Sequence, residues 1–353
     1  MPAAPSHILI IRLSAIGDVV FASPLIKALR RSYPGARLAW LVEPAAAALL
    51  RHNPDLDEVI VWPRGEWRAL IKARRYAECW REVRRFISEL RQRRFDLVLD
   101  TQGLLKSALW AYLSGAKQRI GLGSREGGQY LMTRVLPRHG AEPRIGSEYL
   151  RLAEALGLQI GDFAMDIALS ADDEAYARDF AERHGPYVVL CPFTTRAQKH
   201  WFEQRWAQLA QSVKNGLGLT PVLLGGPSDR QAASRILAQA PVLLSQVGDT
   251  SLSQSAALIK HAVALVGVDT GLTHMGIAFD VPTLALFGST CPYTDTTRAN
   301  AKILYHRLQC SPCRRHPTCG GDFTCMRLID VEEVRTELAD LLAAARPAPL
   351  EKP

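Results

Sequence analysis

The sequence predicts an α/β protein with two doubly wound domains, each a parallel sheet covered by helices. The chain has 353 residues, of which 48% are apolar and 22% charged. That balance is typical of an ordinary globular protein, and the length allows two domains with separate cores. Short runs of apolar, β-branched residues alternate with helical stretches along both halves, which is typical of parallel sheets built from strand–helix–strand units.

The predicted strands fall into two sets of four. In the first half they are residues 8–13, 37–42, 58–62 and 95–99, with a long basic helix before the last one. In the second half they are residues 187–191, 220–224, 263–268 and 283–287. Because helices separate the strands in both halves, each half can close a Rossmann-like fold of its own.

The character of the sequence changes over residues 159–173, where an acidic cluster leads into a new helix. We therefore expect one domain over residues 1–165 and a second over residues 166–330. An amphipathic helix over residues 331–345 follows. The tail to residue 353 contains Pro347, Pro349 and Pro353, and we expect it to be disordered.

Composition also indicates a compartment. No run approaches the roughly 20 apolar residues of a membrane-spanning helix, and no signal peptide is recognisable. Seven cysteines in a chain of this length fit a reducing compartment better than a disulfide framework. The expected location is the cytoplasm.

Positive charge is concentrated in one segment. The net charge is +8, and residues 64–94 alone hold eleven basic and four acidic side chains. Trp62, Trp67, Tyr76 and Trp80 alternate with these bases. Such a segment suits an anionic partner, whether nucleic acid, a phosphosugar or an acidic membrane surface, and a solvated helix face is the alternative.

Ligands of doubly wound sheets bind beyond the carboxyl ends of the strands, so the loops that follow strands hold the candidate site. Ser14, Gly17 and Asp18 follow the first strand. Asp18 is a candidate general base, because a carboxylate can accept the proton of an attacking hydroxyl; an N-cap is the alternative. A single glycine is not the G-x-G-x-x-G fingerprint, so a nicotinamide cofactor gains no support here.

Two loops of the second half suit a diphosphate. Thr194, Thr195 and Lys199 offer hydroxyls and a compact positive charge after the strand at residues 187–191, although a solvated surface loop is the alternative. After the strand at residues 263–268, a glycine and a helix N-terminus would attract phosphate. The residues of this second loop are Asp269, Thr270, Gly271, Leu272, Thr273 and His274. Here Asp269 as a cap and His274 as a core residue are the alternatives.

A third loop follows the strand at residues 220–224. Its glycines allow a tight turn into a helix, and Asp229 could bind the two hydroxyls of a ribose. A helix cap is again the alternative for this carboxylate.

Four blocks of sequence follow one another in a recognisable order. They are SAIGDV from Ser14, DTQGLLKS from Asp100, TTRAQKHW from Thr194 and VDTGLTH from Val268, with GGPSD between the last two. In these blocks, and over nearly its whole length, the chain resembles glycosyltransferase family 9, the ADP-heptose lipopolysaccharide heptosyltransferases. The resemblance implies a GT-B fold, in which an acceptor-binding domain and a nucleotide-sugar-binding domain face a central cleft.

The resemblance also implies an activity and roles for residues. The activity would be an inverting transfer of heptose from ADP-L-glycero-D-manno-heptose to Kdo or the inner core, with no metal required for catalysis. Asp18 matches the catalytic base, and Lys199 matches the residue that stabilises the leaving ADP. Contacts to the nucleotide sugar are implied for Thr194, Thr195, Asp229, Asp269 and the residues from Thr270 to Thr273, with His274 supporting that loop.

Polar and basic residues of the first half are expected to contact the acceptor, since Kdo carboxylates and lipid A phosphates are anionic. They are Ser14, Gly17, Arg64, Arg68, Lys72, Gln102 and Lys106. Peripheral association with the cytoplasmic face of the inner membrane is a corollary. One departure from the family pattern is the run from Ile145 to Glu148, where many relatives have a histidine before the glutamate, so the acceptor pocket can differ.

Four cysteines form the pattern C-x2-C-x5-C-x5-C near the end of the chain. They are Cys310, Cys313, Cys319 and Cys325. Four thiolates can hold a structural zinc ion, and free thiols or a disulfide are the alternatives.

Two other classes of protein compete with the transferase on sequence alone. A nucleic-acid-binding protein would use the basic segment and the cysteine cluster, whereas the transferase needs no nucleic acid. An NAD-dependent enzyme lacks its glycine fingerprint. Even within the family, first and second heptosyltransferases share these motifs, so the acceptor stays open.

Overall fold

The computed structural model describes residues 4–124, 126–138, 142–313 and 316–345. Their contacts divide the chain into two compact units, one of residues 4–138 and 146–168 and the other of residues 142–145 and 169–345. Each unit is described by itself. Across the described residues, no helix combines the length and the apolar character needed to cross a membrane.

The first unit contains a six-stranded sheet in the order β3-β2-β1-β4-β5-β6, and all its strands are parallel. The four strands predicted for this half are present with slightly different ends, and β5 and β6 were not predicted. The strands are β1 (His7–Ile11), β2 (Arg37–Val42), β3 (Glu58–Val61), β4 (Leu97–Asp100), β5 (Gln118–Leu122) and β6 (Arg134–Leu136). The helices are α1 (Ile16–Ala22), α2 (Pro24–Ser32), α3 (Pro44–Ala47), α4 (Arg64–Lys72), α5 (Tyr76–Gln92), α6 (Leu105–Leu113) and α7 (Ser147–Ala155), with a 3-10 turn η1 (Gly128–Leu131).

Both faces of this sheet are covered. Ile8 and Ile10 of β1 belong to one apolar cluster with residues of α1, α2 and α7. Leu9 and Ile11 point to the opposite face and join a second cluster with residues of α4, α5 and α6. Since successive side chains of a strand alternate between faces, a central strand buried on both sides is a continuous apolar run, as β1 is.

The second unit repeats this plan with a parallel sheet in the order β12-β11-β10-β7-β8-β9. The four predicted strands are again present, and β9 and β12 were not predicted. The strands are β7 (Tyr187–Cys191), β8 (Thr220–Leu223), β9 (Leu244–Ser245), β10 (Ala264–Val268), β11 (Thr283–Phe287) and β12 (Ala301–Tyr305). The helices are α8 (Ala171–His184), α9 (Glu203–Leu217), α10 (Arg230–Gln239), α11 (Leu252–Lys260), α12 (Gly271–Ala278), α13 (Thr324–Arg327) and α14 (Val331–Ala345), with 3-10 turns η2 (Ala197–Lys199) and η3 (Pro227–Asp229).

Numbered from its own first strand, each sheet has the Rossmann order 3-2-1-4-5-6. In such a sheet the chain leaves neighbouring strands toward opposite faces at one place, the topological switch point, and ligands bind there. The switch point lies between β1 and β4 in the first unit and between β7 and β10 in the second. The loops after these four strands carry most of the predicted site residues.

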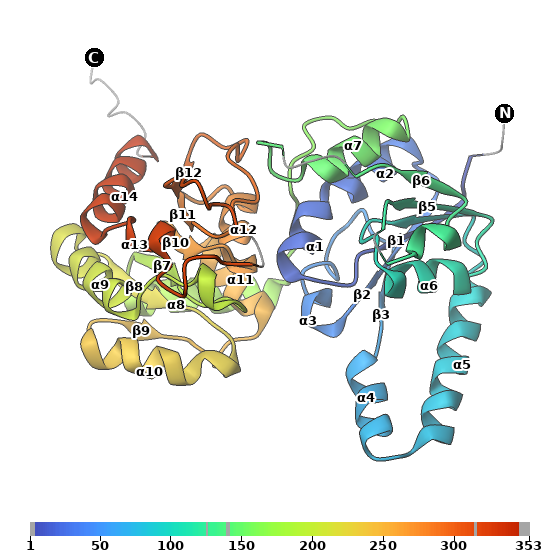
Figure 1. Cartoon of the computed structure of the whole chain (residues 1–353), viewed down its shortest axis with the longest axis horizontal. Helices are drawn as coiled ribbons and strands as arrows, with labels where there is room; N and C mark the ends of the chain where they lie inside the picture. The colour runs from blue at the N-terminus through green and yellow to red at the C-terminus, as the bar shows by residue number, and fades with distance from the viewer. Residues whose placement is uncertain (1–3, 125, 139–141, 314–315, 346–353) are drawn as a thin grey trace. The chain divides into compact units, whose positions relative to one another are not determined.

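The predicted long basic helix before β4 is present as α5, and the basic segment also contains the shorter helix α4, which was not predicted separately. After α4 the chain reverses at Arg74, whose φ of 59° is left-handed, and α5 runs back beside α4. Figure 1 shows both helices extending from the sheet as a hairpin. The sequence at the reversal, Lys-Ala-Arg-Arg-Tyr, contains no glycine or proline, the usual signals of a break.

Aromatic packing holds the base of this hairpin to the sheet. The ring of Trp67 on α4 lies 5.6 Å from Phe86 on α5 and 5.8 Å from Trp110 on α6, between ring centroids. Trp62 at the end of β3 lies 5.6 Å from Trp110. Such aromatic contacts each contribute about 0.5–1.5 kcal/mol beyond area burial, so they help to hold the hairpin on the sheet.

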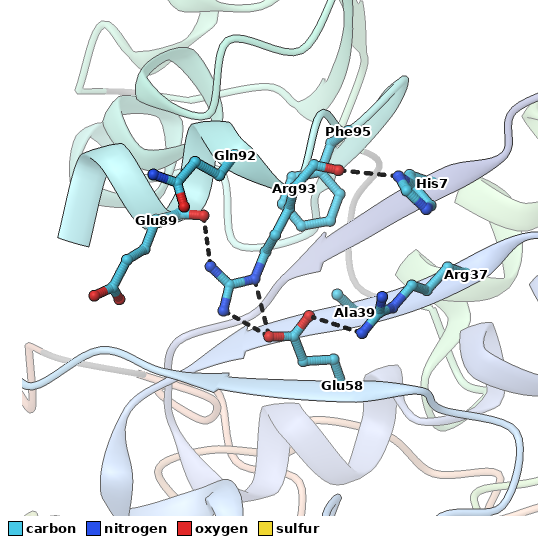
Figure 2. Close-up of a pocket in the computed structure, with 8 residues that line it drawn as sticks. All are labelled: His7, Arg37, Ala39, Glu58, Glu89, Gln92, Arg93 and Phe95. Carbon is cyan, nitrogen blue, oxygen red and sulfur yellow. Dashed lines mark hydrogen bonds and ion pairs between the residues drawn. The ribbon is translucent and has the colours of Figure 1, made fainter. Parts of the chain in front are cut away.

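A polar pocket of about 420 Å³ lies where α5 returns to the sheet (Figure 2). Two guanidinium nitrogens of Arg93 donate to Glu58 Oε1 at 2.9 and 2.6 Å, and the Arg93 carbonyl lies 2.9 Å from His7 Nδ1. His7, Arg37 and Glu58 begin their strands, so this pocket is at the amino end of the sheet. The ion pairs of Glu58 with Arg93 and Arg37 anchor α5 to this end of the sheet. The loops predicted to carry the site lie at the opposite, carboxyl end.

The predicted C-terminal helix has the bounds of α14, and its Val334, Leu338 and Leu341 pack into the core of the second unit. The expectation of a disordered tail concerns Pro347, Pro349 and Pro353, which lie outside the described residues.

Candidate functional site

Asp18 lies at the switch point of the first unit and is held by an arginine. It is the third residue of α1 and caps the start of this helix by accepting from the backbone of Ala15, the N-cap residue, so the capping alternative describes part of its role. Asp18 Oδ2 accepts the backbone N–H of Ala15 at 3.2 Å and lies 2.5 Å from Arg12 Nη2. The Asp18 side chain is 40% exposed, whereas that of Arg12 is only 9% exposed. The Asp18 carboxylate is therefore partly open to solvent, while the buried guanidinium group of Arg12 holds it in position.

Arg12 is fixed in turn by the two strands of the switch point. It follows β1, and its Nη1 donates to the carbonyl of Thr101, which follows β4, at 2.9 Å. The guanidinium carbon lies 5.8 Å from the centre of the buried Tyr149 ring. The guanidinium group of Arg12 thus contacts the loop after β4, the ring of Tyr149 on α7 and the carboxylate of Asp18.

Glu148 of α7 lies in the same electrostatic environment. Burial raises the pKa of Glu148, opposed by the positive charges of Arg138 and Arg12 and reinforced by the negative charge of Asp18. Arg138 Nε lies 3.4 Å from Glu148 Oε1, and Arg138 also donates to the carbonyl of Gln102. Two cations and a second carboxyl group therefore share the electrostatic environment of Asp18.

Two predicted acceptor residues pair with a carboxylate that was not predicted, and a third contacts one of them. Glu43, which follows β2, has its Oε1 3.1 Å from Arg64 Nη1 and 3.2 Å from Lys106 Nζ. Lys106 Nζ also lies 3.4 Å from the Ser14 hydroxyl. Arg64, Lys106 and Ser14 thus form one polar group, with Glu43 balancing part of its positive charge.

The other predicted acceptor residues have different surroundings. Gln102 is buried and its Oε1 accepts the N–H of Leu13 at 3.0 Å, so it fastens the loop after β1. Gly17 is buried in the first turn of α1. Arg68 and Lys72 are exposed further along α4. Acceptor contacts of these four residues stay predictions.

In the second unit, Asp269 and Lys199 form an ion pair at the switch point. Asp269 follows β10, Lys199 closes the turn η2 after β7, and Nζ lies 2.6 Å from Asp269 Oδ2. Both side chains are largely buried, with 11% and 17% exposed. Burial alone would raise the pKa of Asp269, but hydrogen bonds and charge from His274 and Lys199 outweigh it and hold the pKa well below its usual range.

His274 and Tyr293 extend this pair into the core. His274 Nε2 lies 3.3 Å from Asp269 Oδ1, and its Nδ1 lies 2.7 Å from the Tyr293 hydroxyl. Both rings are nearly inaccessible to solvent, and Thr290 donates to the other oxygen of Asp269. A phenol that donates to Nδ1 leaves Nε2–H to donate to the carboxylate. His274 is therefore both a core residue and a support for Asp269.

The remaining residues predicted to bind the diphosphate lie at the same edge of the sheet. Thr194 donates its hydroxyl to the carbonyl of Asp269 at 3.2 Å, and Thr195 beside it is exposed. Thr270 is the N-cap position of α12, and Gly271, Leu272 and Thr273 form its first turn. The first N–H groups of a helix have no partner within it, so they point outward where an anion can bind.

One carboxylate oxygen of Asp229 is already hydrogen-bonded within the turn η3. Its Oδ2 accepts the N–H of Gly226 at 2.8 Å, as the capping alternative expects. The residue is half-buried at the end of η3. A ribose contact would use its second oxygen and stays a prediction.

The cysteine cluster does not have the geometry of a preformed zinc site. All seven cysteines are free thiols, and among the described residues no three His, Cys, Asp or Glu side chains are grouped to hold a metal ion. Cys310 is exposed whereas Cys325 is buried. Structural zinc at the four cysteines stays a prediction, and it would require their side chains to converge.

The comparisons with known proteins agree with one another. The family model described as glycosyltransferase family 9 (heptosyltransferase) matches residues 83–321. Lipopolysaccharide heptosyltransferase 1 of Pseudomonas aeruginosa is 30% identical over 329 residues, which cover 89% of this chain and 87% of that protein. Lipopolysaccharide heptosyltransferase 2 of Salmonella typhimurium is 27% identical, over 95% of this chain and 98% of that protein.

Solved structures agree on the architecture. The structure of E. coli ADP-heptose lps heptosyltransferase II has a TM-score of 0.75 and 25% identity, and the match covers 96% of this chain and 99% of that one. This likeness and the two Rossmann sheets confirm the predicted α/β fold of the GT-B class. Because the family model spans well over half of the sequence, the chain belongs to glycosyltransferase family 9, the heptosyltransferases.

Proposed function

We propose that this enzyme transfers heptose from ADP-heptose to the Kdo or inner-core region of a lipopolysaccharide precursor, with inversion at the anomeric carbon and without a catalytic metal. Relatives of both kinds, heptosyltransferases 1 and 2, support the sugar and the lipopolysaccharide acceptor. The structurally similar E. coli enzyme is an ADP-heptose heptosyltransferase, which supports the same donor here.

The observation that carries the proposal is the buried pair of Lys199 and Asp269 beside the N-terminus of α12. A leaving diphosphate develops negative charge on its bridging oxygen, and an ammonium group with free helix amides can stabilise that charge. When a diphosphate binds, Lys199 can exchange Asp269 for a phosphate oxygen. Asp269 is then available to accept hydrogen bonds from heptose hydroxyls.

Asp18 would serve as the general base. Its Oδ2 is occupied by Arg12 and the Ala15 N–H, so the proton of the acceptor hydroxyl would pass to Oδ1. The acceptor oxygen then forms a bond to heptose C1 as the bond from C1 to the diphosphate oxygen breaks, and ADP leaves with the electron pair. Attack from the side opposite the leaving group inverts C1.

The acceptor would bind through the positive charges of the first unit. Arg64 and Lys106 share Glu43, and a Kdo carboxylate or lipid A phosphate matches the same cations. A lipid-anchored acceptor would bring the enzyme to the cytoplasmic surface of the inner membrane as a peripheral protein.

Substitution of Asp18, the proposed general base, tests the proposal. Asp18→Ala is expected to lower turnover by about a hundredfold or more while leaving the affinity for ADP unchanged, because a lost general base affects the chemical step. Asp172→Ala, an exposed carboxylate on α8, is the matched control. Turnover of Asp18→Ala equal to that of the control would refute the assignment.

A second experiment, on cells that lack the gene, would identify the acceptor. Mass spectrometry of the lipopolysaccharide core from cells lacking the gene shows where the core is truncated. A core that ends at Kdo would identify the first heptose, and a core with one heptose would identify the second. A core that lacks a different sugar would favour a family 9 transferase with another donor or acceptor.

A further inference from the structure

We infer that the tip of the hairpin of α4 and α5 is a membrane-docking element that inserts aromatic and aliphatic side chains into an acidic lipid surface. We define the hairpin tip as residues 71–85. The inference deepens the proposed function and rests on it in one respect, since a lipid-anchored acceptor is the reason for the enzyme to contact a bilayer.

Large apolar side chains are exposed at this tip. Ile71 is 50% exposed, and Tyr76 and Trp80 are each 61% exposed. Tyr76 and Trp80 are four residues apart on α5, so they lie on one face of the helix. Trp67 and Cys79, by contrast, are buried, so the two helices pack without using the exposed rings.

Positive charge surrounds these apolar groups. Residues 71–85 contain six basic and two acidic side chains. Both acidic side chains are in ion pairs, Glu78 with Arg75 at 2.5 Å and Glu82 with Arg85 at 2.9 Å. The exposed bases Lys72, Arg74, Arg81 and Arg84 remain available to an outside anion.

The exposed face continues along α5 as a basic groove. A groove of about 670 Å³ is lined by Trp80, Arg84, Ile87, Arg91 and Leu113 among others. The Arg84 guanidinium carbon lies 5.8 Å from the centre of the Trp80 ring. Tryptophan rings and arginine side chains are enriched where an apolar part enters lipid and a polar part meets phosphate headgroups.

The position of the tip fits its role. The helix α4 starts just after β3, at the carboxyl end of the sheet, and Arg64 at its start belongs to the candidate acceptor group. The nine residues of α4 span about 14 Å, so the hairpin tip begins within about that distance of Arg64. An anchor there would bring the acceptor group close to the bilayer surface.

Apolar exposure favours a bilayer over a nucleic acid as the partner. A nucleic-acid surface needs bases that meet phosphates and can use aromatic stacking, but it gains nothing from an exposed isoleucine. An acidic bilayer, by contrast, interacts favourably with aromatic, aliphatic and basic side chains, and the hairpin tip contains all three kinds.

Vesicle co-sedimentation of the full chain tests the inference without donor or acceptor. Vesicles of phosphatidylcholine mixed with phosphatidylglycerol should bind the enzyme at least tenfold more tightly than pure phosphatidylcholine, since each base near an acidic bilayer tightens binding about fivefold. The double variant Ile71→Ser/Trp80→Ser and the double variant Arg74→Gln/Arg81→Gln should each weaken binding by about tenfold or more.

Matched controls separate the tip from the rest of the surface. Tyr130→Ser removes a ring that is 85% exposed elsewhere in the first unit, and Arg178→Gln/Lys214→Gln removes two exposed charges of the second unit. Tyr130→Ser should bind as the wild type does, and the charge control should lose much less than the tip variant. Thermal melting verifies that every variant is folded.

A depth measurement gives a second readout. Brominated phosphatidylcholine should quench tryptophan fluorescence of the wild type but not of Trp80→Phe, because the other six tryptophans are buried. They are Trp40, Trp62, Trp67, Trp110, Trp201 and Trp206. Equal vesicle binding by wild type and tip variants would overturn the inference. So would hairpin-dependent binding to a duplex oligonucleotide that is tighter than binding to acidic vesicles. Loss of vesicle binding leaves the effect of Asp18→Ala on turnover untouched, so the two proposals fail separately.

Discussion

Arg12 is the residue whose replacement tests the first unit most directly. Its Nη2 contacts Asp18 at 2.5 Å and its Nη1 donates to Thr101 at 2.9 Å, in two different directions. Arg12→Met removes both contacts and keeps much of the side-chain volume. Arg12→Lys keeps the charge, but one ammonium group cannot reproduce the planar fork that serves both acceptors.

The expected size of the effect follows from these contacts. A hydrogen bond to a charged group contributes about 1.5–3 kcal/mol, and the lower end applies to Asp18 because its side chain is 40% exposed. If that interaction orients the base, kcat of Arg12→Met falls by roughly tenfold or more. The Thr101 carbonyl loses a buried donor, which costs about 1–3 kcal/mol of unfolding free energy and lowers Tm by several degrees.

The assay separates positioning from folding. Steady-state transfer should show a lower kcat with little change in the acceptor KM, and calorimetry should show unchanged ADP affinity, because the residues proposed to bind ADP belong to the other unit. Arg12→Lys should lie between wild type and Arg12→Met. Arg12→Met with wild-type kcat, or with a defect confined to Tm, would refute the view that this cation orients the base.

Three further predictions concern charge at the two switch points. Lys199→Gln should weaken ADP binding by about tenfold in calorimetry, since a charge-assisted contact to the diphosphate is lost, and unchanged affinity would contradict the role of Lys199. Burial raises the pKa of Glu148, so its contribution to stability is full below the ordinary glutamate value of about 4.3 and declines as pH rises through the folded-state pKa. Glu148→Gln removes the cost of ionising a buried carboxyl group, so it should raise Tm more, or lower it less, at pH 8 than at pH 4. The opposite trend in thermal melts would show that ionisation of Glu148 carries no such cost. Excess EDTA should leave the transfer rate unchanged, because Lys199 and α12 supply the positive potential; a loss restored by Mg²⁺ would show that a metal is needed.

The sequence is informative about residues that directly follow a strongly apolar strand. Asp18 and Lys199 follow the central strands β1 and β7, and their place at the carboxyl end of the sheet could be predicted because the loop after every strand of a parallel sheet lies at that end. The missed strands β5, β6, β9 and β12 include all but one of the sheet edges. Edge strands are partly exposed and short, as β6 with two exposed residues of three illustrates, so their apolar pattern is weak.

Partners that are distant in sequence could not be predicted. Glu43 pairs with Lys106, 63 residues away, and Arg138 pairs with Glu148 across a loop. No local pattern marks Glu43 as a site residue, because a glutamate before a proline is common at a helix start. Tyr293 and Thr290 complete the surroundings of Asp269 from a loop after β11, which a single sequence does not indicate.

Each switch point keeps its cations beside a resident carboxylate, Glu43 in one unit and Asp269 in the other. An incoming anion must therefore compete with a group that is already present and cannot diffuse away. At the one-to-one pair of Asp269 and Lys199, a ligand with one negative charge merely replaces one ion pair by another, whereas a diphosphate gains a net attraction. Glu43 balances only one of the two charges of Arg64 and Lys106, so an anion with a single charge can bind beside it. We therefore expect the edge at Asp269 to select multiply charged ligands and the edge at Glu43 to accept a singly charged sugar acid as well.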